Sequence, residues 1–174
     1  MSYSLTFRER LAAISHSPLS PRVACARARF RKYSNCVSDE LIADANFLAN
    51  HGSVRDLVLV FSNQNLLETY DSNVHLRLAH RLVDIARKEV CDEYRQTIAS
   101  SASGFAYIIA LRKSRDKLIL VAQELTDLLS FEHINGEAKK VIRSFTSDAF
   151  AVPIIGDSLD PQLSAFFEEI LKDR

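Results

Sequence analysis

Apolar residues recur every three or four positions along most of the chain, which is the spacing of helices that bury one face. This period predicts helices over residues 3–15, 22–33, 39–51, 54–61 and 72–98, another that includes 118–128, one that begins near 136 and a last one from 160. Glycine and proline number only four each in 174 residues, so we expect short connections. The pattern therefore predicts the all-α fold class.

The stretch from residue 22 to residue 33 is the most basic of these helices. Wound at about 100° per residue, its apolar stripe consists of Val23, Ala26, Phe30 and Tyr33 and continues to Val37. The rest of the circumference carries Arg22, Arg27, Arg29, Arg31 and Lys32. As a strand, one face would be mostly alanine, which strands disfavour, so a helix is the better interpretation. Long basic side chains also occur on ordinary solvated helices, and the charges alone do not separate the two readings.

Local signals mark several helix ends. Pro21 suits the first position of a helix, and Ser38 followed by two acidic residues is a typical N-cap. Gly52 predicts a pause between the third and fourth helices.

The second half of the chain contains a longer helical pattern. Between residues 72 and 98, apolar steps of three and four predict a seam for lengthwise packing, formed by Leu76, Ala79, Val83, Ala86 and Val90. An apolar segment at 105–111 and a basic run at 112–117 are expected to precede the next helix as separate segments.

Charge is unevenly distributed, although the chain is neutral overall. Residues 1–36 hold seven Lys or Arg against one acid, whereas residues 144–174 hold two against six. The basic beginning favours a partner with an acidic surface.

Catalytic motifs are absent from the sequence. It contains no Walker loop, no dinucleotide fingerprint and no serine nucleophile elbow. The five histidines are scattered, and Cys25, Cys36 and Cys91 lack the spacing of metal ligands. Each cysteine lies in or beside a helical stretch, where a small buried thiol is expected. We therefore expect neither an enzyme nor a metal site.

The chain has no apolar run long enough to span a bilayer, which takes about 20 residues. Its Arg-rich, Ser-rich beginning is typical of a mitochondrial transit peptide. We expect this segment to belong to the mature fold and to carry internal targeting information.

Three motifs in the first fifty residues occur in a characteristic order: a short triplet within "SLTFRERLAAI", a basic residue three positions before phenylalanine within "ACARARF", and a polar turn with an acid. The matching residues are Thr6, Phe7 and Arg8 in the triplet, Arg27 and Phe30 with Arg31 following, and Ser38 and Asp39 in the turn. In this order and spacing, residues 3–60 resemble the LYR-motif family of small mitochondrial three-helix proteins. Within that family, "ACARARF" particularly resembles the LYR-type accessory subunit of respiratory complex I.

The resemblance implies a fold and a partner. The fold would be an LYR-type three-helix bundle over residues 1–70, followed by a helical extension over residues 71–174. The partner would be mitochondrial acyl carrier protein, which is acidic and whose acylated phosphopantetheine arm enters between the three helices; the chain itself would carry no cofactor. The residues implied in this contact are Arg8, Arg27 and Arg31, as an outer docking surface, and Phe7 and Phe30, which line or close the groove.

The function implied by the resemblance is that of a non-catalytic accessory subunit or assembly factor of a mitochondrial complex, with respiratory complex I foremost. The protein would lie on the matrix side or peripheral to the inner membrane, and neighbouring subunits would pack against the extension. No nucleic acid is expected in this reading.

Two other readings use the same basic helix. A helical scaffold or RNA-binding protein would place the cations on phosphates, with exposed aromatic rings for base stacking. A membrane-surface or calmodulin-type helix would share the amphipathic signal without explaining the helices on either side.

Overall fold

The computed structural model of this chain describes residues 21–33, 35–100 and 103–151. Every regular element within these ranges is a helix and none is a strand, which confirms the all-α class. The helices expected over 3–15 and from 160 lie outside the described residues, as do Phe7 and Arg8.

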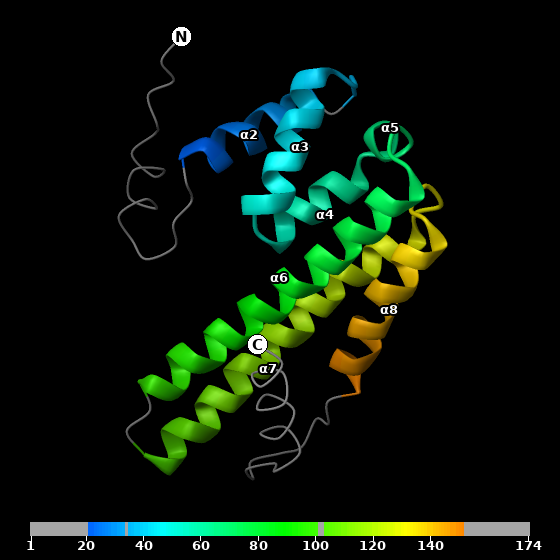
Figure 1. Cartoon of the computed structure of the whole chain (residues 1–174). Helices are drawn as coiled ribbons and strands as arrows, with labels where there is room; N and C mark the ends of the chain where they lie inside the picture. Colours follow the sequence, from blue (N-terminus) through cyan, green and yellow to red (C-terminus); the bar gives the residue numbers. More distant parts are fainter. Residues whose placement is uncertain (1–20, 34, 101–102, 152–174) are drawn as a thin grey trace. The chain divides into compact units, whose positions relative to one another are not determined.

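The chain divides into two compact units, residues 1–69 and residues 70–174. The first unit contains α2 (Pro21–Lys32), α3 (Asp39–His51), α4 (Val54–Ser62) and the single turn α5 (Gln64–Leu67). Figure 1 shows these elements in chain order, and α3 packs against both α2 and α4.

The buried face of α2 is shorter than the sequence predicted. Val23, Ala26 and Phe30 are buried, and Phe30 is 0% exposed. The helix ends at Lys32, however, so Tyr33, at 51% exposure, and Val37 lie beyond its last turn and face solvent. The prediction that both continue the buried stripe is wrong, because an apolar period alone does not locate the end of a helix.

The junctions around α3 follow the local signals. The Ser38 hydroxyl accepts a hydrogen bond from the Leu41 N–H at 3.2 Å, which confirms the N-cap. At the other end the Gly52 N–H donates to the Leu48 carbonyl at 2.7 Å. A Cβ atom at position 52 would lie 2.5 Å from that carbonyl oxygen and 2.6 Å from the Cβ of Asp56, so only glycine fits this close approach.

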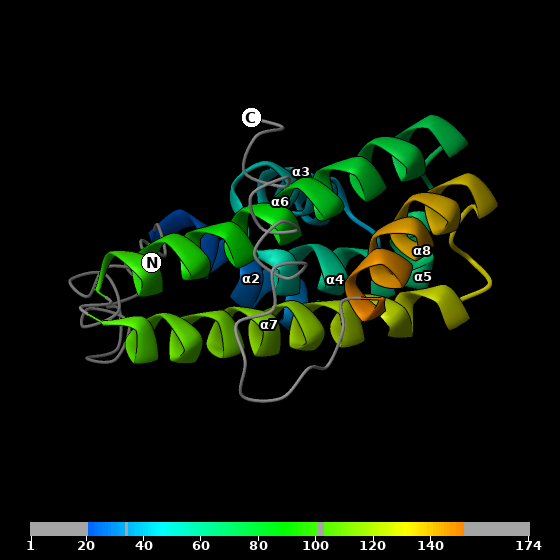
Figure 2. The same cartoon turned by 90° about the horizontal axis from the view of Figure 1, so that it is seen from below.

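The second unit is built from α6 (Ser72–Ala99), α7 (Gly104–Thr126), a 3₁₀ turn (Asp127–Ser130) and α8 (Gly136–Phe150). The three long helices contact one another pairwise. Figures 1 and 2 both show α6 and α7 side by side, with the shorter α8 beside the end of the pair where α6 begins and α7 ends.

The helix α7 corrects a second expectation. The apolar segment 105–111 and the basic run 112–117 are not separate segments, because both belong to one continuous helix. Lysine and arginine have good helix propensity. Lys113 and Lys117 also reach across to α6, where they form ion pairs with Glu93 at 3.3 Å and Glu89 at 3.7 Å.

The buried face of α6 is wider than one seam. Ala79, Val83, Ala86 and Val90 are buried as predicted, whereas Leu76 is only partly covered. Further buried positions are Leu78, Leu82 and Ile85. Because α6 contacts both α7 and α8, a single stripe cannot account for all of its buried residues. Within the described ranges, no helix combines the length and apolar character that crossing a bilayer requires.

Replacing Phe30 by alanine is expected to lower the free energy of unfolding of the first unit by about 3 to 5 kcal/mol, because the lost ring leaves a cavity in the core. Urea denaturation followed by circular dichroism measures this loss. The control Tyr33→Ala removes a half-exposed ring and should change the same quantity by about 0.5 kcal/mol or less. Equal losses in the two variants would contradict the burial of Phe30.

Candidate docking site

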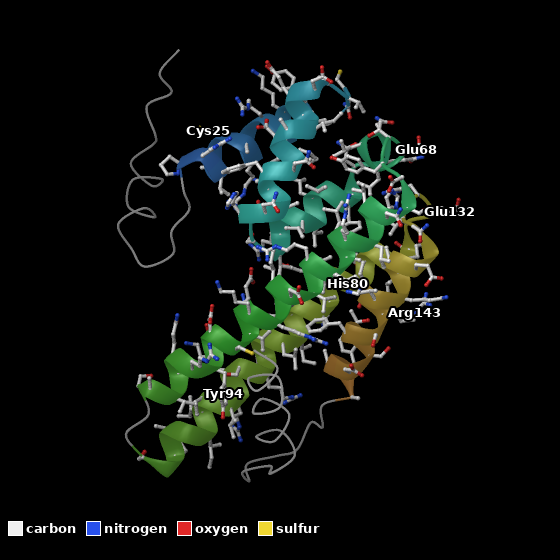
Figure 3. All side chains as sticks on the ribbon, in the orientation of Figure 1. Cys25, Glu68, His80, Tyr94, Glu132 and Arg143 are labelled. Carbon is white, nitrogen blue, oxygen red and sulfur yellow. The ribbon has the colours of Figure 1, made fainter. Side chains whose placement is uncertain are left out.

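The basic helix α2 contains five cationic residues and no acidic one. Three of these cations contact residues of α3 or α4, although two of the three are themselves exposed, and the other two, Arg31 and Lys32, are exposed in the last turn. Figure 3 shows the side chains of this helix, with Cys25 labelled. The division among the five cations determines which of them can meet a partner.

Arg27 is bound to Asp56 of α4. Its Nη2 donates to Asp56 Oδ2 at 2.7 Å, and its Nε donates to Oδ1 of the same carboxylate. Asp56 is 1% exposed, and the Arg27 side chain is 23% exposed. This bidentate geometry is the one in which guanidinium and carboxylate groups bind most strongly. It ties the middle of α2 to the first turn of α4.

The Asp56 carboxylate also caps α4. Its Oδ2 accepts hydrogen bonds from the Ser53 N–H at 2.8 Å and the Ser53 hydroxyl at 3.1 Å. Serine followed three residues later by an acid is the capping-box signature, and "SVRD" at 53–56 carries it. This signal in the sequence could have identified Asp56 as a structural carboxylate, and our sequence analysis missed it.

Burial and hydrogen bonding act on Asp56 in opposite directions. Burial raises the pKa of the carboxyl group. The hydrogen bonds from Arg27 and Ser53 and the positive charge of Arg27 lower it by more than burial raises it, so the net pKa is below its usual 3.8. The hydrogen bond to Asp56 in turn raises the pKa of Arg27 against the opposing effect of burial. Both groups are therefore charged at neutral pH.

Two more arginines of α2 are held by α3. Arg29 donates from Nε and Nη2 to the two oxygens of Asp44 at 2.9 and 2.6 Å, and Asp44 is buried. The Arg22 guanidinium carbon lies 4.2 Å from the centre of the Phe47 ring, within the range of a cation–π contact. These contacts align α2 on α3.

Arg31 and Lys32 are the remaining cations of α2, and both are exposed. They lie in the last helical turn, where a positive charge interacts favourably with the helix dipole. The Lys32 Nζ lies 5.2 Å from the centre of the Tyr33 ring, which is exposed as well. The end of α2 therefore presents two adjacent cations and an aromatic ring to solvent, and we call Arg31, Lys32 and Tyr33 the basic end of α2.

The predicted site residues are thus separated by the structure. Arg31 is exposed as expected, and Phe30 lies in the core. Arg27 was predicted on the outer solvent-facing arc, and that placement is wrong because its guanidinium group is bound to Asp56. Phe7 and Arg8 lie outside the described residues.

The burial of the three cysteines agrees only in part with the prediction from the sequence. Cys91 is buried as predicted, but Cys25 and Cys36 are exposed, so the expectation of buried thiols was wrong for both. Cys25 points outward because it falls on the side of α2 opposite Phe30. In the part of the chain that the structure describes, no three His, Cys, Asp or Glu side chains gather as metal ligands.

Arg27→Ala is expected to lower the free energy of unfolding by about 3 kcal/mol, because it leaves the buried Asp56 carboxylate without its cation. Arg31→Ala is the matched control, one helical turn along the same helix, and should cost about 0.5 kcal/mol or less. Urea denaturation of the two variants beside the parent gives the comparison. A loss in Arg31→Ala as large as that in Arg27→Ala would contradict the different roles assigned to the two arginines.

The lowered pKa of Asp56 predicts a pH-dependent contribution to stability. At pH values between the folded pKa and 3.8, the unfolded chain binds a proton that the folded chain does not, so stability rises with pH. The contribution is complete above about pH 5 and is lost as pH falls through the folded pKa. Asp56→Asn should therefore be less stable than the parent at neutral pH, by a gap that narrows below about pH 4. A gap that stays constant down to about pH 2.5 would contradict this role.

Comparisons of this chain with family models, with curated proteins and with solved structures give no match.

Proposed function

We propose that this chain is a non-catalytic accessory subunit or assembly factor of a mitochondrial complex, and that it docks acyl carrier protein through the basic end of α2. The observation that carries the proposal is the adjacent exposed pair Arg31 and Lys32, on a helix without an acidic residue. Respiratory complex I is the first assembly to test, because the resemblance of residues 3–60 leads there.

The two cations would mainly orient the partner and speed the encounter. Exposed ion pairs contribute only about 0 to 1 kcal/mol each, so Arg31 and Lys32 cannot by themselves hold a stable complex. Complementary charge acts more strongly on the association rate. Most of the affinity would come from the acyl chain, because each methylene group buried in the bundle contributes about 0.8 kcal/mol.

Arg27 has a different task in this proposal from the one its position in the motif implies. It orients α2 through Asp56, and Arg31 and Lys32 make the contact with the acidic partner. Phe30 lines the core beneath the same helix turn. Arg8 and Phe7 would complete the docking surface and the groove from the preceding segment.

A second function is favoured by one specific observation. Tyr33 is exposed beside Arg31 and Lys32, and an exposed aromatic ring next to cations is what base stacking and phosphate contacts require. A helical scaffold that binds RNA through the basic end of α2 is therefore the alternative.

The first experiment is native mass spectrometry of the full chain co-expressed with mitochondrial acyl carrier protein, followed by a denaturing mass of the partner. We expect a one-to-one complex in which the partner carries an acylated phosphopantetheine group. Arg31→Glu combined with Lys32→Glu should weaken the complex by at least about tenfold. Arg87→Glu combined with Lys88→Glu is the matched control, because it changes the same exposed dipeptide on α6 and should leave binding unchanged.

A folded chain that recovers no acyl carrier protein would contradict the docking proposal. RNA filter binding then tests the alternative, which predicts affinity that falls steeply with salt. Loss of that binding in both Tyr33→Ala and the Arg31, Lys32 double variant would support the RNA-binding scaffold.

A further inference from the structure

The start of α8 is attached to the beginning of α6 by one hydrogen bond. The Asn135 N–H donates to Nδ1 of His75 at 3.1 Å, and the two residues are 60 positions apart in the sequence. The His75 side chain is buried, and Figures 1 and 2 both show the start of α8 at the end of the second unit where α6 begins. A backbone N–H can only donate, so Nδ1 is the acceptor nitrogen of His75. We call this hydrogen bond the α8 latch.

Asn135 is also the N-cap of α8. Its Oδ1 accepts a hydrogen bond from the Glu137 N–H at 2.7 Å, and its carbonyl accepts one from the Lys139 N–H at 3.0 Å. The residues Ile134 and Ala138, on either side of this cap, are buried. The main-chain N–H, the main-chain carbonyl and the side chain of Asn135 are therefore all bound in the folded chain.

The residue that follows Asn135 is glycine, and this is the only Asn–Gly pair in the sequence. Asparagine before glycine is especially prone to deamidation, because glycine has no Cβ atom to crowd the attacking nitrogen and its backbone rotates easily. Gly136 is exposed, and a Cβ atom on it would lie in open space. As the first residue of α8, it has an N–H group without an acceptor inside the helix. The pair therefore combines a reactive sequence with access to water.

Deamidation of this pair begins at the Gly136 nitrogen. The nitrogen attacks Cγ of Asn135 and loses its proton, the bond from Cγ to Nδ2 breaks, and ammonia leaves, which closes a five-membered imide. Water then opens the imide at Cγ to give aspartate, or at the main-chain carbonyl carbon to give isoaspartate. The only co-reactant is water.

The folded chain holds the pair in a conformation that cannot close this ring. Closure requires the Gly136 nitrogen to eclipse Cβ of Asn135 about the Cα–C bond, but ψ of Asn135 is 142°, which leaves the nitrogen about a quarter turn away. The α8 latch fixes the Asn135 nitrogen before this bond, and the burial of Ala138 fixes α8 after it. Rotation therefore breaks the hydrogen bond from the Glu137 N–H and separates the start of α8 from α6.

We propose that Asn135–Gly136 is a deamidation site that the α8 latch keeps closed. The reaction proceeds only from the open form, in which the start of α8 has separated from α6. Isoaspartate makes this opening permanent, because the additional main-chain methylene group prevents the cap and the latch from forming together. Aspartate is a good N-cap residue and lets α8 close again.

The proposal is tested by incubating the full chain at neutral pH and following residue 135 by peptide mapping with mass spectrometry. The parent should react at least about tenfold more slowly than the same chain unfolded in urea. His75→Phe keeps an aromatic ring but removes the acceptor, and should raise the rate in the folded chain by about threefold to tenfold. His80→Phe is the matched control, because it makes the same change at an exposed position of α6, labelled in Figure 3, and should leave the rate unchanged.

Gly136→Ala tests the chemistry independently of the latch. Its methyl group meets no other part of the fold but crowds the attacking nitrogen, so the reaction should nearly stop in the folded chain and in urea alike. Circular dichroism verifies that each variant is folded before incubation.

Three results would overturn the proposal. They are a parent that reacts as fast as the unfolded chain, a folded His75→Phe variant that reacts no faster than the parent, and a Gly136→Ala variant that reacts like the parent. None of these results depends on the basic end of α2.

Discussion

The carboxylate of Asp56 holds two helices of the first unit in one arrangement. It accepts the Ser53 N–H at the start of α4 and two guanidinium N–H groups of Arg27 from α2. Since a buried charge is costly unless it is paired and hydrogen-bonded, the loss of either contact would leave part of the desolvation cost of the carboxylate without compensation. The turn at Gly52 depends on the same group, because the Asp56 side chain occupies the space that a Cβ atom there would need.

This arrangement shows that the cations of the basic helix α2 have different roles. Arg22, Arg27 and Arg29 have partners on α3 or α4, so their charges serve the packing of the unit. Arg22 and Arg29 are nevertheless exposed, as Arg31 and Lys32 are, so what distinguishes the last two is that neither is bound to a residue of α3 or α4. The sequence places Arg27 and Arg31 on the same polar arc, and the period cannot show that one of them meets an acid 29 residues away. The candidate site could therefore be located on the right helix, but its residues could not be sorted without the tertiary contacts.

Helix bounds were more predictable than the site because caps and apolar periods depend on residues within one or two turns. Ser38 and Gly52 act locally, and both mark the ends of α3 as expected. The two predictions about helix bounds that were wrong have physical reasons. Tyr33 continues the apolar period after the helix has stopped. The basic run 112–117 was interpreted as an interruption, although its lysines are held by glutamates of α6 and support the helix.

Because α7 is one uninterrupted helix, the angular phase of its buried positions is fixed by every residue along it. Each residue turns the helix by about 100°, so one residue inserted near Ser114 would rotate the buried positions before it out of line with those after it. An insertion in the link at 131–135 would leave that phase unchanged. We therefore expect an insertion in the link at 131–135 to be tolerated better than one within α7.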